Sequence, residues 1–229
     1  MSGFVDRENE IFEVLQEFVD AGLDFVVVGG YGVSAFQHRF SVDADLVLRE
    51  GDLDRFTEIL QGRGFEEVED RELDVYGGRY LAYQKDEELP VTIDLLVNSL
   101  RCRQTDASWS YDYFQDHSTT AEIEGSEKSV TVRVPEAELL AAVKLHSGRL
   151  TDARDVVALS SEIDFDQVEQ HMDRGDSERL DEVLEDVFET ISGENFEDSF
   201  KGVFSQKELP SQQIEALRDF IQEQLEEVD

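Results

Sequence analysis

The pattern of apolar and polar residues differs between two parts of the chain. In the first 134 residues, short apolar runs of strand length alternate with amphipathic stretches of helical period. The runs predicted as strands are residues 25–28, 42–48, 65–68, 79–84, 91–97 and 128–134. The predicted helices between them are residues 8–21, 31–38 and 52–62. From residue 135 onward, the apolar pattern has the helical period throughout.

This division predicts an α/β (α+β) fold, with a small mixed sheet and flanking helices followed by an all-helical C-terminal half. We expect two domains, residues 1–134 and residues 135–229. Pro135 is expected at the first position of the first C-terminal helix, where proline is favoured. The stretch 98–118 has no regular period, and we predict an ordered loop or lid there whose aromatic residues pack into the core rather than stack on bases.

Length and composition set the broad class. The chain has 229 residues, of which 40% are hydrophobic, so it can bury a sizeable core. No apolar run approaches the roughly 20 residues that span a bilayer, and the N-terminus does not resemble a secretory signal. The single Cys102 excludes an intrachain disulfide framework and a multi-cysteine metal site. We therefore expect a cytoplasmic protein without a membrane partner.

The charge of the chain is extreme. Fifty-five acidic residues face 20 basic ones, which gives a net charge of −35 spread along the whole sequence. Such a charge destabilises a compact state through self-repulsion, but at molar salt the Debye length falls to about 3 Å and the repulsion is screened. The composition indicates a cytoplasmic protein of a halophile. It removes the usual basic-patch evidence for a nucleic-acid partner without excluding one.

The candidate chemistry begins with Asp43 and Asp45. Alternation places both carboxylates on one face of the strand predicted for residues 42–48. Two like charges a few ångströms apart repel strongly, so such a pair needs a counter-ion. Mg²⁺, which is usually bound through one or two carboxylates plus substrate phosphates, meets that need.

The run from apolar strand through Gly29-Gly30, twelve intervening residues and then Asp43-Ala44-Asp45-Leu46, with Asp94 on a later strand, resembles the polymerase-β-like nucleotidyltransferase superfamily. The resemblance implies that the glycine pair admits a nucleoside triphosphate (NTP) close to backbone amides. It implies a two-metal Mg²⁺ (or Mn²⁺) site with Asp43, Asp45 and Asp94 as ligands. Asp94 would also accept the proton of the attacking hydroxyl. The implied activity is transfer of a nucleoside monophosphate from an NTP to a hydroxyl.

Two further segments resemble the AbiEii-type branch of that superfamily, which contains toxins of type IV toxin–antitoxin systems. They are Arg39-x-Ser41-x-Asp43-x-Asp45 and the run Lys144-x4-Arg149-x2-Asp152-x2-Asp155. The resemblance implies a tRNA or other RNA acceptor, a toxin role and a cognate antitoxin. It places Arg39, Ser41, Lys144, Arg149 and Asp155 in the nucleotide-binding set, with Lys144 on the phosphates and counted as catalytic.

Simpler roles compete with these assignments. A lone lysine on an amphipathic helix usually extends to solvent, and Asp152, Asp155 and Arg149 can form local ion pairs at a helix N-terminus. The whole protein could also be a catalytically inactive nucleotidyltransferase fold that serves as a binding or regulatory module.

A dinucleotide-binding protein is a further alternative. Gly30-x-Gly32-x-x-Ala35 follows a predicted strand, and Glu50 lies twenty residues beyond Gly30, as in the NAD-binding fingerprint. The helix after these glycines is short for a crossover helix, and no regular βαβ alternation follows. The fingerprint also leaves the three aspartates unexplained.

Overall fold

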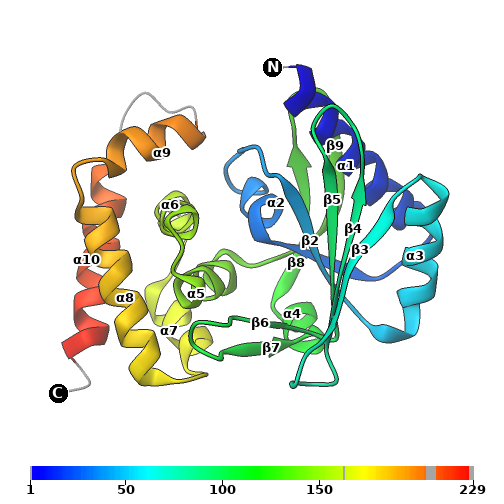
Figure 1. The fold of residues 1–229 in the computed structure, drawn as a ribbon. Helices are drawn as coiled ribbons and strands as arrows, with labels where there is room; N and C mark the ends of the chain where they lie inside the picture. Colours follow the sequence, from blue (N-terminus) through cyan, green and yellow to red (C-terminus); the bar gives the residue numbers. More distant parts are fainter. Residues whose placement is uncertain (1, 162, 205–209, 227–229) are drawn as a thin grey trace. The chain divides into compact units, whose positions relative to one another are not determined.

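The structure, a computed structural model, describes residues 2–161, 163–204 and 210–226. The chain divides into two compact units. The first comprises Met1–Leu100 and Trp109–Glu136, and the second comprises Arg101–Ser108 and Ala137–Asp229. The first unit holds a mixed sheet with flanking helices, and the second is helical apart from residues of one hairpin (Figure 1). The predicted α+β class and helical C-terminal half are therefore confirmed.

Five strands form the sheet of the first unit, in the order β1-β2-β5-β4-β3. Their bounds are β1 Phe25–Val28, β2 Asp43–Leu48, β3 Glu66–Glu72, β4 Arg79–Lys85 and β5 Val91–Val97. β2 and β5 are parallel, whereas the other neighbouring pairs are antiparallel. A dinucleotide-binding βαβ unit needs parallel strands on either side of its glycine turn. The antiparallel pairing of β1 with β2 therefore excludes the NAD-binding alternative.

The two faces of this sheet differ in polarity. Leu46, Leu48, Ile93 and Leu95 point into a hydrophobic core that also includes residues of α1 (Ser2–Asp20) and α3 (Leu53–Gly62). Alternation then assigns the intervening acidic positions of β2 and β5 to the opposite face. Burial of the apolar face is what holds those acidic positions in register.

Short elements complete the first unit. They are α2 Gly29–Ser34, the 3₁₀ turn Glu50–Asp52, α4 Tyr111–Asp116, and the hairpin of β8 Ser118–Glu124 and β9 Ser129–Pro135. α2 starts and ends earlier than the helix expected at 31–38. β8 was not predicted, because it is a largely exposed strand with few apolar residues.

The stretch 98–118 is more regular than expected. It contains β6 Ser99–Arg101, β7 Ser108–Ser110 and α4. Trp109, Tyr111 and Phe114 are buried, which confirms core packing as the use of these aromatic side chains. The prediction for Pro135 was wrong, because this residue ends β9 opposite Ser118 and the next helix begins at Ala137. A proline at the end of an edge strand needs no backbone N–H.

The helices of the second unit are α5 Ala137–Ser147, α6 Leu150–Leu159, α7 Phe165–Met172, α8 Ser177–Ser192, α9 Phe196–Phe204 and α10 Ser211–Glu226. α5 is apolar on nearly all sides and contacts α6, α7 and α8. None of the helices described is long and apolar enough to cross a membrane.

The hairpin tip Arg101–Ser108 belongs to this helical unit. Thr105 Oγ1 lies 2.7 Å from His146 Nδ1, and the backbone N–H of Asp176 donates to the Thr105 carbonyl at 2.7 Å. Cys102 Sγ contacts the carbonyl of Val143. Burial lowers the pKa of His146 to about 4, so its ring is neutral at pH 7 and acts as a structural hydrogen-bonding group.

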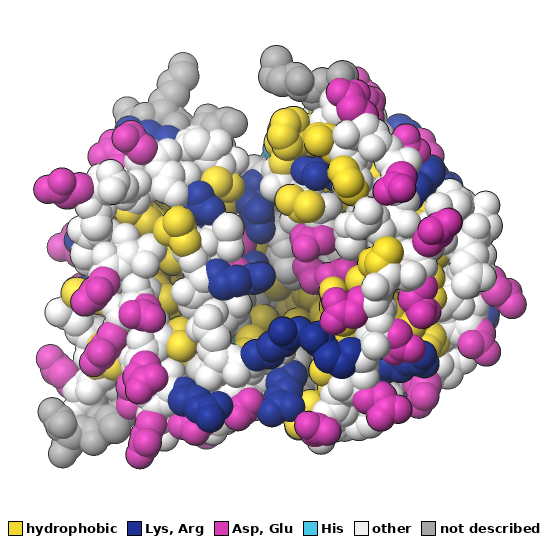
Figure 2. Space-filling view, viewed as in Figure 1, with side chains coloured by type: hydrophobic (Ala, Val, Ile, Leu, Met, Phe, Trp, Pro, Cys, Tyr) yellow, Lys and Arg dark blue, Asp and Glu magenta, His cyan; other side chains and the backbone are white. Residues whose placement is uncertain are grey.

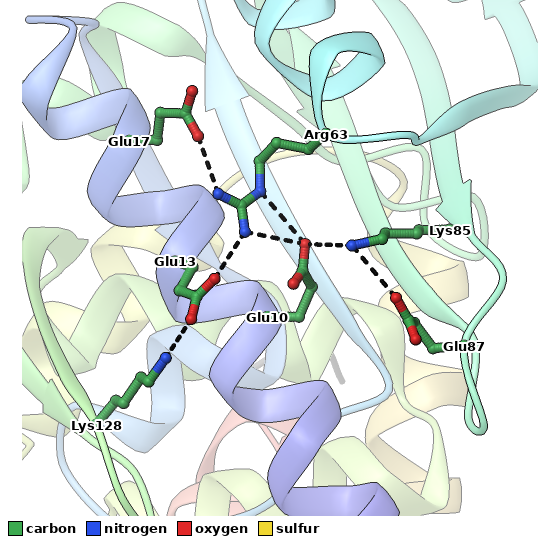
Figure 3. Close-up of polar contacts among 7 residues, drawn as sticks. All are labelled: Glu10, Glu13, Glu17, Arg63, Lys85, Glu87 and Lys128. Atoms are coloured by element: carbon green, nitrogen blue, oxygen red, sulfur yellow. Dashed lines mark hydrogen bonds and ion pairs between the residues drawn. The ribbon is translucent and has the colours of Figure 1, made fainter.

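Acidic side chains are scattered over both units on the face seen in Figure 2 rather than gathered in one patch. Figure 3 shows how one acidic row is neutralised in the first unit. Glu10, Glu13 and Glu17 lie along one side of α1, and the Arg63 guanidinium contacts all three at 2.8–3.1 Å. Lys85 also pairs with Glu10, and Lys128 with Glu13. One arginine therefore joins the end of α3 to α1 through three like-charged residues.

Replacing Arg63 by Met should destabilise the protein by about 2 kcal/mol at low salt, because three partly exposed ion pairs are lost and three carboxylates are left facing one another. In molar KCl most of the loss should disappear because the repulsion is screened. Urea denaturation at both salt concentrations measures the effect. Arg103→Met is the matched control, since Arg103 is exposed and makes no ion pair within the described residues. An equal loss for both variants, or one independent of salt, would contradict the interpretation.

Candidate functional site

Three carboxylates meet on the non-core face of the first unit's sheet. Asp43 and Asp45 are two residues apart on β2, and the parallel register places Asp45 opposite Asp94 on β5. Asp43 and Asp45 are partly exposed, whereas Asp94 is only 8% exposed. The sequence predicted that these three residues lie together from strand alternation and from the family resemblance. In the structure, the pairing of β2 with β5 brings them together.

The surroundings of Asp94 disfavour its ionised form. The Tyr80 hydroxyl donates to its Oδ2 at 2.9 Å, whereas its Oδ1 is buried without a hydrogen-bond partner among the described residues. Burial raises the pKa of Asp94 to about 6, with smaller increases from the charges of Asp43 and Glu69 and a decrease from the Tyr80 hydrogen bond. The ionised form is thus held where both low polarity and like charge oppose it.

Glycine is required where α2 begins beside these carboxylates. Gly29 has φ +60, and a Cβ built there would lie 1.9 Å from Asp45 Oδ2. A Cβ on Gly30 would lie 2.3 Å from Ser41 Oγ and 2.6 Å from Arg39 Nη2. The two glycines therefore allow the side chains of three other predicted site residues to pack directly against the backbone.

The segment between α2 and β2 is held by two anchors. The Ser34 hydroxyl donates a hydrogen bond to the Arg39 carbonyl oxygen at 3.0 Å. His38 Nε2 lies 2.9 Å from Glu8 Oε1, and Glu8 is 1% exposed on α1. These contacts fix the segment that carries Arg39, four residues before Asp43, the first carboxylate of the site.

The other predicted site residues lie in the second unit. Lys144 Nζ contacts Asp152 Oδ1 at 2.7 Å and Asp155 Oδ2 at 2.9 Å, and all three side chains are at most 5% exposed. Arg149 Nε donates to Asp152 Oδ2 at 2.7 Å, while 66% of the Arg149 side chain is exposed. Although burial opposes ionisation, Lys144 and Arg149 lower the pKa of Asp152 to about 2.

This second cluster bears on the role predicted for Lys144. Its ammonium already contacts two buried carboxylates, and their charges raise its pKa although its burial acts in the opposite direction. Arg149 is the cation of the cluster that solvent reaches. The phosphate contact of Lys144 and the ordering role of Arg149 and Asp155 stay predictions.

Two residues were not in the predicted site set. Asp152 was part of the motif, and the structure shows that it joins Lys144 to Arg149. Tyr80 gave no sequence signal, because its contact with Asp94 depends on the register between β4 and β5. A strand register of this kind cannot be read from one apolar run.

Comparisons with known proteins bear on the fold. No protein-family model and no curated protein matches the chain, but solved structures do. A nucleotidyltransferase, so named in its description, from H. pylori has a TM-score of 0.53 and 13% identity, over 100% of this chain and 99% of that one. JHP933 from Helicobacter pylori has a TM-score of 0.52 and 16% identity, over 99% and 94% of the two chains.

A third neighbour is ANT(2″)-Ia, solved in complex with adenylyl-2″-tobramycin, at a TM-score of 0.50 and 16% identity, covering 72% of this chain and 93% of that one. At such low identity the likeness concerns the fold. The chain therefore has the fold of nucleotidyltransferases, as the sequence resemblance implied.

Proposed function

We propose that this protein is a Mg²⁺-dependent nucleotidyltransferase that transfers a nucleoside monophosphate from an NTP to a hydroxyl group. The observation that carries the proposal is the group of three carboxylates on one sheet face, where Asp94 is buried and its Oδ1 has no hydrogen-bond partner among the described residues. A chain gains nothing in stability from such an arrangement unless a cation joins it. The nucleotidyltransferase fold supports the reaction class.

The donor set fits a hard divalent cation. Asp43, Asp45 and Asp94 offer carboxylate oxygens alone, which are the ligands that Mg²⁺ and Mn²⁺ prefer. The buried Oδ1 of Asp94 is a polar atom for which the described part of the chain provides no hydrogen bond. Two ions bound by these residues would stabilise the attacking and leaving oxygens of an in-line displacement.

The chain's own groups account for binding and proton transfer. The acceptor oxygen bonds to the α-phosphorus, the bond to pyrophosphate breaks, and the hydroxyl proton passes to Asp94. The pKa of about 6 belongs to the metal-free site, and a bound cation would lower it, so Asp94 would be ionised near neutral pH and able to accept the proton. Gly29 and Gly30 let the side chains of Asp45, Ser41 and Arg39 pack against the start of α2, which keeps two nucleotide-binding candidates beside a metal ligand.

The acceptor is proposed from two sources. The resemblance to the AbiEii-type branch favours an RNA end, with tRNA first, and with it a toxin role and a cognate antitoxin. The adenylylated tobramycin bound to ANT(2″)-Ia makes an aminoglycoside hydroxyl the second acceptor to test. The acidic composition favours assays in molar KCl, the condition expected for a halophile.

Purified protein with α-labelled NTPs and Mg²⁺ should label either total RNA or an aminoglycoside. Asp43→Ala and Asp45→Ala should each lower the rate by on the order of 10³-fold, because the charge-stabilising site is lost. Asp54→Ala, at an exposed position on α3, is the matched control and should keep wild-type activity. Product from neither acceptor with any NTP would favour the inactive, regulatory alternative.

Gly29→Ala should abolish divalent-metal binding, because the new Cβ and Asp45 Oδ2 cannot occupy the same space. Gly22→Ala is the matched control: Gly22 has a similar φ of +66 but has no heavy atom within 4 Å of the added Cβ. Both variants should lose about 1–2 kcal/mol of stability from the left-handed backbone. Isothermal titration with Mn²⁺ separates them, and equal Mn²⁺ affinity in the two variants would refute the packing argument.

The buried Asp94 should make metal-free stability depend on pH. Its folded pKa of about 6 lies above the unfolded value of about 3.9, so the protonated carboxyl favours the folded state fully below pH 4. That contribution is lost as the pH rises to about 6. In EDTA, Asp94→Asn should therefore be more stable than wild type by about 2 kcal/mol at pH 7, and the advantage should vanish near pH 4.

Urea denaturation of Asp94→Asn and wild type at pH 4, 5, 6 and 7 measures this difference, and Mg²⁺ should stabilise only wild type at pH 7. A difference between the two proteins that is constant from pH 4 to 7 would show that Asp94 ionises normally.

A further inference from the structure

A β-bulge changes which face of the sheet the residues of β3 occupy. Glu67 pairs with Tyr83 on β4, but the next paired residue, Glu69, pairs with Ala82. Val68 is therefore the extra residue, and the alternation of β3 is reversed from Glu69 onward. Tyr83 belongs to the core face and its hydroxyl donates to Glu67 at 3.0 Å. Glu69 consequently lies on the carboxylate face.

The reversed segment supports Tyr80. Arg71 pairs directly with Tyr80 across the strands, and its guanidinium lies 4.9 Å from the centre of the phenol ring. Glu69 Oε1 lies 3.3 Å from Arg71 Nη1 on the same face. The Tyr80 hydroxyl then donates to Asp94 Oδ2 at 2.9 Å. A chain of contacts thus runs across three strands, from β3 through β4 to β5.

We propose that Tyr80, itself held by Arg71, is a positioning residue that orients Asp94 for a divalent cation. This inference rests on the metal site of the proposed function. One oxygen of Asp94 is engaged by the phenol, so the carboxylate plane is fixed and its Oδ1 stays available for the cation. Hydrogen bonds to a ligating carboxylate commonly set metal affinity in this way.

The bulge gives this contact its support. Without it, regular alternation would direct Glu69 and Arg71 to the same face as Glu67, the face of Tyr83. Tyr80 would then lose the cation on its ring, and a half-buried phenol with three rotamers would hold Asp94 less well. The irregular step in an edge strand is thereby connected to the site two strands away.

The experiment measures Mn²⁺ affinity of the full chain, by titration calorimetry in molar KCl so that exposed acids are screened. Tyr80→Phe removes only the hydroxyl and should raise the Kd for Mn²⁺ by about 10- to 100-fold. Tyr83→Phe is the matched control, since it removes the same group from the same strand on the opposite face. It should leave the Kd unchanged, although both variants can lower the melting temperature.

Arg71→Gln tests the support while keeping the phenol, and should raise the Kd by about 2- to 5-fold, as expected for loss of one cation–π contact. Arg71→Gln also tests the positioning role on its own if Tyr80→Phe folds poorly. Wild-type affinity in both Tyr80→Phe and Arg71→Gln would overturn the inference.

Asp94→Asn distinguishes the two levels of the argument. Loss of Mn²⁺ binding in this variant with no effect of Tyr80→Phe would reject the positioning role alone. Unchanged Mn²⁺ binding in Asp94→Asn would instead reject the metal site of the proposed function.

Discussion

The parallel pairing of β2 with β5 is the constraint on which the site depends. Because Asp45 stands opposite Asp94 in that register, two carboxylates are adjacent on one face, and Asp43 adds a third. The favourable energy that holds them there comes from the other face, where the alternate residues of the same strands are buried against α1 and α3. Apolar packing thus keeps like charges at a separation that they would not adopt in a free chain.

The pKa of a buried aspartate is shifted in opposite directions in the two clusters. Asp152 has Lys144 and Arg149 against it, so its pKa falls to about 2 and its charge is fully compensated within the second unit. Asp94 is buried beside other acids, so its pKa rises to about 6 although the hydrogen bond from Tyr80 acts in the opposite direction. The same residue type at similar burial is therefore stabilised as an ion in one cluster and destabilised in the other. The second pattern is the one typical of a functional site.

The sequence predicted the fold class, the strands of the sheet and the candidate acids, because alternation and helical period are local properties. It did not predict Tyr80, the Val68 bulge or the anchoring of His38 by Glu8, since each depends on contacts between segments far apart in the chain. β8 was not predicted from the sequence for a different reason. It is an exposed edge hairpin, and its mostly polar sequence carries little of the apolar signal on which strand prediction rests.

Because the hairpin tip Arg101–Ser108 belongs to the helical unit, that unit is discontinuous in the sequence. The backbone passes between the two units three times, after Leu100, after Ser108 and after Glu136. Thr105 is thus synthesised 41 positions before His146, the residue that it contacts. The helical unit has no contiguous gene segment of its own, so a single recombination breakpoint cannot transplant it intact. A fragment that begins at Ala137 would therefore lack the hairpin tip that contacts His146.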